Sequence, residues 1–258
     1  MMRLPSALLA CLIAAALAAP ALAPYPPDHL DLAHRREAPS HAHRFGTDDL
    51  GRDVLARVLY GARVSLAVGL LSAAVAGASG IAVGGIAGYA GGILDAFLMR
   101  GTDAMLAVPR LPLLMIAAAV FQPSVPLLVV LIGLAGWMET ARVVRAEFQT
   151  LRTRGFVESA RAAGASHARL IAVHLLPNAA QAVVVSLTLA VARGILIESA
   201  LSFFGVGVQP PQASWGNMLY QAQATLSTEP WLALAPGVFI LLTTVSVNMA
   251  GDRLARSR

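Results

Sequence analysis

The feature that most constrains this chain is the length of its uncharged apolar runs. Val64 to Ala90 is 27 residues without one charged side chain, and Leu4 to Ala23 and Trp231 to Met249 are also uncharged. A helix needs ~20 apolar residues to cross the ~30 Å hydrocarbon core of a bilayer. The composition, 57% hydrophobic and 13% charged, is typical of a membrane protein. These runs predict an all-α, polytopic membrane protein.

A fourth run is interrupted. Leu111 to Met138 has no charge, but Pro123 and Pro126 stand in its middle, and two prolines so close favour a turn over one helix. The part before the turn, Leu111 to Phe121, is only ~16 Å long as a helix, so it must extend backward along the chain. We expect the charged side chains on that extension to face protein or the cytoplasmic interface: Arg100, Asp103 and Arg110.

The part after the turn predicts a span from Val125 to about Val144, which ends at Arg142 and Arg145. One more apolar region, Ala179 to Phe204, contains Arg193 and Glu198. The chain is therefore predicted to have about six transmembrane helices.

The arginines predict the orientation of the spans, because cytoplasmic loops of membrane proteins carry an excess of basic residues. All 19 basic residues are arginines. Arg142 to Arg169 holds six arginines against two acids, and the tail adds Arg253, Arg256 and Arg258. Val206 to Pro230 has none. We expect the first segment and the tail in the cytoplasm, with Arg3 and Arg100, and Val206 to Pro230 outside.

Because successive spans cross the membrane in alternating directions, Pro24 to Arg63 is also expected outside, although it has six arginines. Six acidic residues balance them, so we interpret it as a folded, partly amphipathic loop on the outer surface. Asp48 or Asp49 could cap a helix beginning near Leu50. That helix would either cap the surface or contact substrate.

The first apolar segment has alternative interpretations. Arg3, a Leu/Ala run and then Ala21-Leu22-Ala23 are typical of a secretory signal with its cleavage site. Pro24 disfavours cleavage, so we expect the segment to be retained as a transmembrane helix. Cleavage would leave five spans in the same orientation. A lipoprotein signal ending at Cys11 would have an apolar region of only six residues, which is too short.

Gly155 to Asn178 lies between two apolar regions and has the start and stop signals of a helix–turn–helix. Helix-forming residues from Phe156 to Ala163 precede Gly164, which can end that helix. Ser166 can cap a second short helix, and Pro177 is expected to prevent its continuation. The order Glu158-Ser159-Ala160, Gly164 and Leu176-Pro177 is more than a generic linker between spans requires.

This order resembles the "EAA" loop of ABC-transporter permeases, which docks onto the ATPase subunit. Serine at position 159 replaces the central alanine of the triplet, a change between small residues. The resemblance implies that the ATPase-coupling residues are Glu158, Ser159, Ala160, Gly164, Leu176 and Pro177.

Further stretches narrow the resemblance to the C-type permease of the dipeptide/oligopeptide/nickel family. They are residues 43–63, beginning His43-Arg44-Phe45-Gly46-Thr47-Asp48-Asp49-Leu50-Gly51-Arg52, residues 202–219, beginning Ser202-Phe203-Phe204-Gly205, and the Gly91-Gly92 to Pro109 region. The similarity covers about residues 44–253. The family's longer cytoplasmic segment ahead of the first span is nearly absent here, which would fit a misassigned start.

The resemblance implies a type I ABC importer permease fold in a bacterial inner membrane. Its expected divisions are a first helix or signal-like anchor (1–23), a periplasmic loop (24–63), a permease core (64–250) with the coupling loop (152–178), and a cytoplasmic tail (251–258). The implied partners are a homologous permease subunit, two ABC ATPases, a periplasmic or lipid-anchored solute-binding protein and membrane lipid, with no nucleic acid. The implied cargo is a di- or oligopeptide, with nickel or another small solute as the alternative.

Nothing in the chain is expected to be catalytic. A phosphate-cradling P-loop ends in Gly-Lys-Ser/Thr, and this chain contains no lysine. ATP and Mg²⁺ would therefore be bound by the partner ATPases, with no cofactor in this chain.

Arg193 and Glu198 are candidate residues of the translocation pathway or gate. They are five positions apart, roughly 140° around a helix, so we do not expect them to pair with each other. Arg193 stands where the family usually has a small uncharged residue. It could reach another subunit or a wet cavity and tune substrate charge, or form a structural ion pair.

Three rival hypotheses come from other classes. Gly77-Ala78-Ser79-Gly80 spells the GxSG motif of an intramembrane serine protease, but that serine needs a histidine from another span, and no histidine lies in the predicted spans. Ser79 is better interpreted as a small residue at a helix contact, with glycines at four-residue spacing. A stand-alone secondary transporter would not explain the helix–turn–helix. An outer metal site would use His34, His41 and His43.

Overall fold

The computed structural model describes residues 4–256, and this range contains helices and no strand. In chain order the elements are α1 (Leu4–Leu17), α2 (Ala19–Leu22), η1 (Leu32–His34), α3 (Val54–Ala90), α4 (Gly92–Ala107), α5 (Arg110–Val120), α6 (Val125–Leu134), α7 (Trp137–Leu151), α8 (Gly155–Ala162), α9 (His167–Arg169), η2 (Leu170–Leu175), α10 (Leu176–Phe203), α11 (Trp215–Ala222), η3 (Gln223–Thr225) and α12 (Trp231–Arg256). Arg3 and Arg258, which the arginine count places in the cytoplasm, lie outside the described residues.

Three helices are long and apolar enough to cross a bilayer. They are α3, the continuous helix His167–Phe203 formed by α9, η2 and α10, and Trp231–Ala255 of α12. Two bent helix pairs pass the same test together, which raises the number of candidate spans to five. These correspond to the second through sixth predicted spans.

Both bent pairs depart from the straight helices that the sequence suggests. The third span does extend backward from Leu111, but α4 and α5 meet at 81°, because Pro109 caps α5 and cannot continue α4. In the fourth span, α6 and α7 meet at 42° around Ala135 and Gly136. Helix α7 then continues to Leu151, beyond the predicted end at Val144.

The first apolar segment is shorter than the other spans. Helix α1 has 14 residues and is followed by the one-turn helix α2, and α1 packs against α12 and α3. Retention of this segment as a sixth span therefore stays a prediction.

Small residues let α3 and α7 approach closely. A Cβ at Gly80 would lie 2.7 Å from the Cβ of Thr140, and one at Gly88 would lie 2.7 Å from the carbonyl oxygen of Arg145. A Cβ at Gly84 would collide with the backbone of Ala141. The predicted small-residue helix contact is confirmed for these three glycines of α3, with α7 as the partner.

The prediction that Pro177 stops the second short helix is wrong. The chain passes through the π-helical turn η2 into α10, with Pro177 in the first turn of α10. The amide of Leu176 donates to the carbonyl of Ile171, five residues back. Widening the turn in this way accommodates a residue that has no N–H and whose ring would clash in a regular helix interior.

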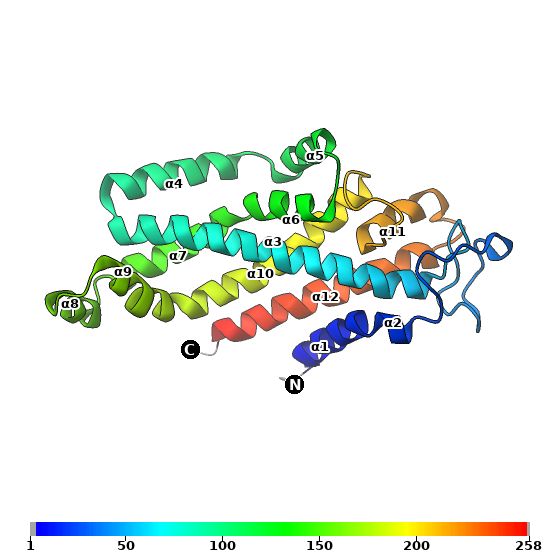
Figure 1. Cartoon of the computed structure of the whole chain (residues 1–258), viewed down its shortest axis with the longest axis horizontal. Helices are drawn as coiled ribbons and strands as arrows, with labels where there is room; N and C mark the ends of the chain where they lie inside the picture. The colour runs from blue at the N-terminus through cyan, green and yellow to red at the C-terminus, as the bar shows by residue number, and fades with distance from the viewer. Residues whose placement is uncertain (1–3, 257–258) are drawn as a thin grey trace.

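The segments predicted for opposite sides of the membrane lie at opposite ends of the molecule (Figure 1). Helices α8 and α9 project from one end, while α11 and the loop that follows α2 lie at the other. Three apolar clusters run between these ends. The first joins α1, α3, α10, α11 and α12, the second α3, α5, α6 and α10, and the third α7, α8, η2 and α10. Helices α3 and α10 therefore connect the two ends.

Candidate coupling loop and outer cap

Helix α8 is held to the rest of the chain by its buried side. Val157 is fully buried and shares an apolar cluster with Leu170 and Leu175 of the following turn, and with Val144 and Phe148 of α7. Burying an aliphatic side chain of this size stabilises by ~1.5–3 kcal/mol. The base of the loop is therefore packed onto α7 and the start of α10.

The opposite side of α8 is open. Glu158 and Ser159 are exposed, Ala160 is half-buried, and Phe156 keeps 43% of its surface accessible. Glu158 lies in the first turn of α8, where the helix dipole favours a carboxylate. Two residues of the triplet predicted to contact an ATPase, Glu158 and Ser159, therefore face outward, while Ala160 packs against the apolar cluster beneath α8.

The turn after α8 has the predicted glycine geometry. Gly164 has a φ of +83°, and its amide donates to the carbonyl of Arg161 while the amide of Ala165 donates to that of Ala160. These two bonds form a Schellman motif, which satisfies the last carbonyls of α8. Ser166 then accepts a hydrogen bond from the amide of Arg169 at 3.4 Å, as predicted for the cap of the next helix. The whole turn is built from local contacts.

Leu176 and Pro177 lie beyond this turn, at the start of α10. Leu176 is half-buried beside the third apolar cluster, and Pro177 is exposed. The six predicted coupling residues therefore share one end of the molecule, but Pro177 contributes a helix start and not a helix stop.

This loop is fixed to its neighbours by three residues that were not predicted as site residues: Tyr89, Arg152 and His167. The Tyr89 hydroxyl, at the end of α3, lies 2.5 Å from Nδ1 of His167, and Arg152 donates to the carbonyl of Tyr89 at 3.3 Å. Gly91 follows with a φ of +67°, and a Cβ there would lie 2.6 Å from the Arg152 guanidinium. The sequence signal that could have indicated this contact is Tyr89, a polar aromatic residue at the end of the uncharged run from Val64 to Ala90.

Helix α4 is tied to α7 by charges near the same end. Arg145 donates to both carboxylate oxygens of Asp95, at 2.5 and 2.7 Å, and Gln149 adds a bond of 3.0 Å. Arg142 pairs with Asp103 at 2.5 Å. Of the charges expected to face protein or the cytoplasmic interface, Asp103 is paired but exposed, Arg100 is exposed, and Arg110 is half-buried and paired with Glu139.

At the other end, the segment before α3 folds into a compact unit that we call the outer cap (residues 28–57). Asp53 is the N-cap of α3 and accepts from the amide of Ala56 at 2.8 Å, while its second oxygen lies 2.9 Å from Nδ1 of His43. The prediction that Asp48 or Asp49 caps a helix beginning near Leu50 is wrong. Asp48 instead accepts from the amides of Leu50 and Arg52, which forms a turn ahead of the helix.

This segment was predicted to be a partly amphipathic loop on the outer surface, but two of its arginines are buried. Arg52 is 4% and Arg57 1% exposed. Arg52 donates to Asp48 at 2.6 Å, and the Nε of Arg57 lies 3.6 Å from the same carboxylate. A buried guanidinium is costly unless it is paired, so Asp48 holds this part of the fold together.

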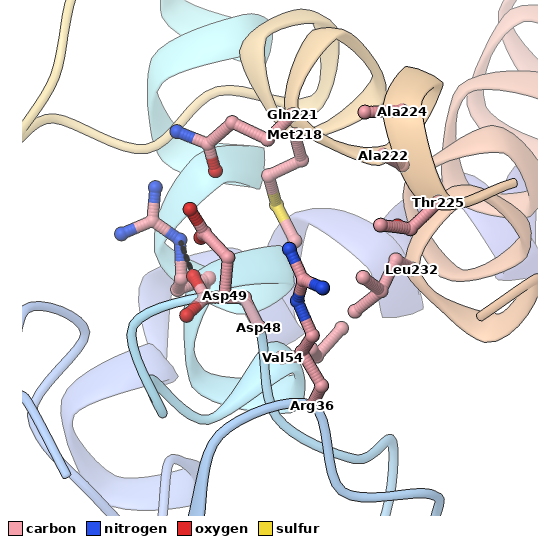
Figure 2. A pocket seen from close by; sticks show the side chains of 11 residues that line it. Arg36, Asp48, Asp49, Val54, Met218, Gln221, Ala222, Ala224, Thr225 and Leu232 are labelled. Carbon is pink, nitrogen blue, oxygen red and sulfur yellow. Dashed lines mark ion pairs between the residues drawn. The ribbon is translucent and has the colours of Figure 1, made fainter. Parts of the chain in front are cut away.

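A small cavity of about 120 Å³ separates the outer cap from α11 and η3. Figure 2 shows Asp48, Asp49 and Arg36 on one side and Met218, Ala222 and Thr225 on the other. Arg36 also pairs with Glu229 at 3.7 Å. The cap is therefore closed against the segment that follows α10 by polar as well as apolar contacts.

Among the described residues, no group of three or more His, Cys, Asp or Glu side chains could hold a metal ion. Nδ1 of His34 lies 2.7 Å from Asp31. This hydrogen bond raises the pKa of His34 and lowers that of Asp31. His34 and His43 therefore each face a carboxylate within the outer cap.

Glu198 is fully buried between α3, α10 and the loop before α11. It accepts hydrogen bonds from Ser65 at 2.9 Å and from Ser202 at 2.8 Å. Ser65 in turn accepts from the amide of Trp215 at 3.2 Å, and Ser202 accepts from the amide of Val208 at 3.0 Å. The carboxylate thus organises the loop that links α10 to α11, and its part in a gate stays a prediction.

Arg193 does not contact Glu198, as expected from their spacing. Its Nη2 lies 3.1 Å from one oxygen of Glu139 on α7, and Nη2 of Arg110 lies 3.1 Å from the other. This set of three residues is called the Glu139 triad below. Glu139 was not predicted as a site residue, although it is the one acidic residue in the apolar region from Leu111 to Ala141.

Comparison with known proteins identifies the family. Residues 80–258 match the family described as "Binding-protein-dependent transport system inner membrane component". A protein of Brucella suis biovar 1 that carries a provisional peptide-permease name is 41% identical over 96% of this chain and 82% of its own length.

Two relatives come from Bacillus subtilis strain 168. Its dipeptide transport system permease protein DppC is 38% identical over 93% of this chain and 75% of its own length. Its oligopeptide transport system permease protein OppC is 35% identical over 94% of this chain and 80% of its own length. With its several apolar helices and the loop at one end, this chain is a multi-pass membrane protein that belongs to the inner-membrane components of binding-protein-dependent transport systems, the permease subunits of ABC importers.

Proposed function

We propose that this chain is the transmembrane permease subunit of an ATP-driven importer of di- or oligopeptides in a bacterial inner membrane. The observation that carries the proposal is the open side of α8, which combines an exposed Glu158 with a locally completed turn at Gly164. Permease names for dipeptides and oligopeptides among the relatives support the cargo. Nickel or another small solute is the alternative that the same fold could serve.

The proposed complex contains this chain, a homologous permease subunit, two ABC ATPases and a solute-binding protein that is periplasmic or lipid-anchored. Because the chain has no lysine for a P-loop, we assign ATP and Mg²⁺ to the ATPases and no cofactor to this subunit. In this arrangement α8 lies in the cytoplasm and the outer cap outside.

The proposed mechanism is alternating access driven through α8. When the ATPases close, they would displace α8, and the cluster around Val157, Leu170 and Leu175 would carry that displacement into α7 and α10. The helix His167–Phe203 has 37 residues and is therefore ~55 Å long, so it reaches from the coupling loop to the segment held by Glu198. A movement at one end would thus change the other without local unfolding.

We assign ATPase coupling to Glu158, Ser159, Ala160, Gly164, Leu176 and Pro177. The exposed Glu158 can reach arginines or backbone amides of an ATPase, and the small residues beside it allow a close approach. Arg193 and Glu198 remain proposed for the pathway or gate, Arg193 by lining a cavity and Glu198 by holding the loop between α10 and α11.

The test is uptake by the complete complex reconstituted in vesicles with its binding protein. ATP-dependent accumulation of a labelled dipeptide, with no accumulation of Ni²⁺, supports the proposal. Uptake of Ni²⁺ without peptide would show that the cargo is nickel and not a peptide. ATP hydrolysis by the purified chain alone would contradict the assignment of ATP to the partner ATPases.

A further inference from the structure

The Glu139 triad has an excess positive charge within the membrane-spanning region. One carboxylate is shared by two guanidiniums, each with one contact of 3.1 Å. Among the ion pairs of residues 4–256, Arg110 and Arg193 have no second acidic partner, so the triad has a net charge of +1. An uncompensated charge at this depth is costly, and such residues usually face water or a substrate path.

The triad is also accessible. The side chains of Arg193 and Glu139 are 37% and 34% exposed, and that of Arg110 is 22% exposed. Lipid contact at this level would be unfavourable for all three. Accessible charged surface of this kind is expected to face water or another protein subunit and not lipid.

Two cavities meet at Glu139. One of about 320 Å³ is lined by Glu139, Arg193 and apolar side chains that include Val143, Val185 and Leu189. The other, of about 310 Å³, is lined by Glu139, Arg110 and apolar side chains that include Leu113 and Met138. Each thus combines an apolar wall with one arginine, as expected of a site for an amphipathic small molecule.

The triad sits where both broken spans bend. Arg110 is the first residue of α5, after the 81° bend, and Glu139 is in the first turn of α7, after the 42° bend. The helix dipole favours the carboxylate of Glu139 at that position and disfavours the guanidinium of Arg110 at the start of α5. An additional anion near Arg110 would therefore be stabilised by both the guanidinium and the helix terminus.

We propose that Arg193 binds the carboxylate of a peptide as it passes through this subunit, with Glu139 holding the guanidiniums of Arg193 and Arg110 in place and limiting the affinity. The inference rests on the proposed peptide cargo. Guanidinium groups bind carboxylates through paired hydrogen bonds, which gives them specificity over a neutral amide. The apolar walls accept the side chains without selecting among them.

The test measures equilibrium binding of a labelled dipeptide to the complete transporter complex in lipid nanodiscs, without the solute-binding protein. A dipeptide with a free carboxyl terminus is compared with its C-terminally amidated form. The wild-type complex is expected to bind the free carboxylate about tenfold more tightly, as one charge-assisted hydrogen-bonded contact allows.

Arg193→Met should reduce this preference to near unity, while Glu139→Gln should increase the affinity for the free carboxylate. A purely structural ion pair predicts the same loss from both substitutions, so opposite effects identify ligand binding. Arg100→Met, which removes an exposed arginine from α4, is the control and should leave the preference unchanged.

Equal binding of the two peptides by the wild-type complex would overturn the inference, as would a preference that survives Arg193→Met. So would the absence of peptide binding in a complex that transports peptides with its binding protein. If that complex transports no peptide at all, the proposed cargo fails instead, which separates the two outcomes.

Discussion

Two glycines with nearly the same backbone angle show how differently the two ends of this molecule are built. Gly51 in the outer cap has a φ of +75°, and Gly164 in the coupling loop has a φ of +83°. A Cβ at Gly51 would collide with the backbone of Asp31, whereas a Cβ at Gly164 would meet nothing within 4 Å. The outer cap is closed onto its own chain, and the coupling loop leaves space around itself.

Charged side chains follow the same division. In the outer cap, Arg52, Arg57 and Asp48 are buried against one another, and Asp53 serves both α3 and His43. In α8, Glu158 is exposed. Groups that find their partners within the chain maintain the fold, and groups presented outward on a firmly packed base are available to another subunit.

The largest expected effect is a difference in folding stability between valine substitutions at Gly51 and at Gly164. Gly51→Val should destabilise the folded chain by at least ~3 kcal/mol, because it combines a strained φ with a backbone collision. Gly164→Val should cost only the strain, ~1–2 kcal/mol, at the end of an exposed turn. Thermal unfolding in detergent and the yield of membrane-inserted protein measure the difference. Equal losses from the two variants would contradict the comparison.

The second prediction reverses one charge on the coupling loop. Glu158→Arg should leave unfolding unchanged within ~0.5 kcal/mol, as surface substitutions usually do, but should reduce co-purification of the ATPase and peptide uptake by about tenfold or more. Asp252→Arg makes the same charge change at an exposed position of α12 and should have little effect. Ser79→Ala is a second control, for the protease motif.

Loss of uptake in Ser79→Ala together with normal uptake in Glu158→Arg would remove the coupling assignment. Loss of ATPase co-purification in Asp252→Arg as well would show that net charge at this end, and not the position of Glu158, determines docking.

The third prediction tests the cap of α3. Asp53→Ala removes the hydrogen bond to the amide of Ala56 and the partner of His43, so it should destabilise the chain by ~1–2 kcal/mol. Asp53→Asn can still cap the helix and should recover most of that loss. Thermal unfolding of both variants is the measurement, and an unchanged Asp53→Ala would show that the outer cap does not depend on this residue.

The smallest expected effect is a pH dependence at the exposed edge of the outer cap. Asp31 raises the pKa of His34, so the pair stabilises the loop below the ordinary histidine pKa and loses that contribution as pH rises through the raised value. The lowered pKa of Asp31 means that the contribution also falls in acid. Corrected amide-exchange protection of this loop should be higher at about pH 5.5 than at about pH 8.5, and His34→Gln should abolish the difference.

Local signals predicted much of the molecule, and long-range contacts account for the errors. The uncharged run before Ala90, the proline turn at Pro123 and the glycine at 164 each act within a few residues, and each has the predicted structure. The burial of Arg57 was not predicted because it depends on contacts with Asp48 and Pro27, which no local pattern records.

The same distinction applies to the candidate sites. Gly164 and Ser166 are local signals, because one ends a helix and the other caps the next. The Glu139 triad instead joins residues 29 and 54 positions apart along the chain. Pro177 was assigned as a stop because proline usually ends a helix, and the wider turn of η2 removes that constraint.

The most direct test of the division between the two ends is the accessibility of a single cysteine at each. In a Cys11→Ser background, Ser159→Cys on α8 should not react with a membrane-impermeant maleimide in intact cells, and it should react in inverted vesicles unless the ATPase is bound. Gln212→Cys, in the segment that precedes α11, should show the reverse access and no protection by the ATPase. Labelling of Ser159→Cys from outside the cell, or labelling in vesicles that the ATPase does not reduce, would contradict α8 as the docking site.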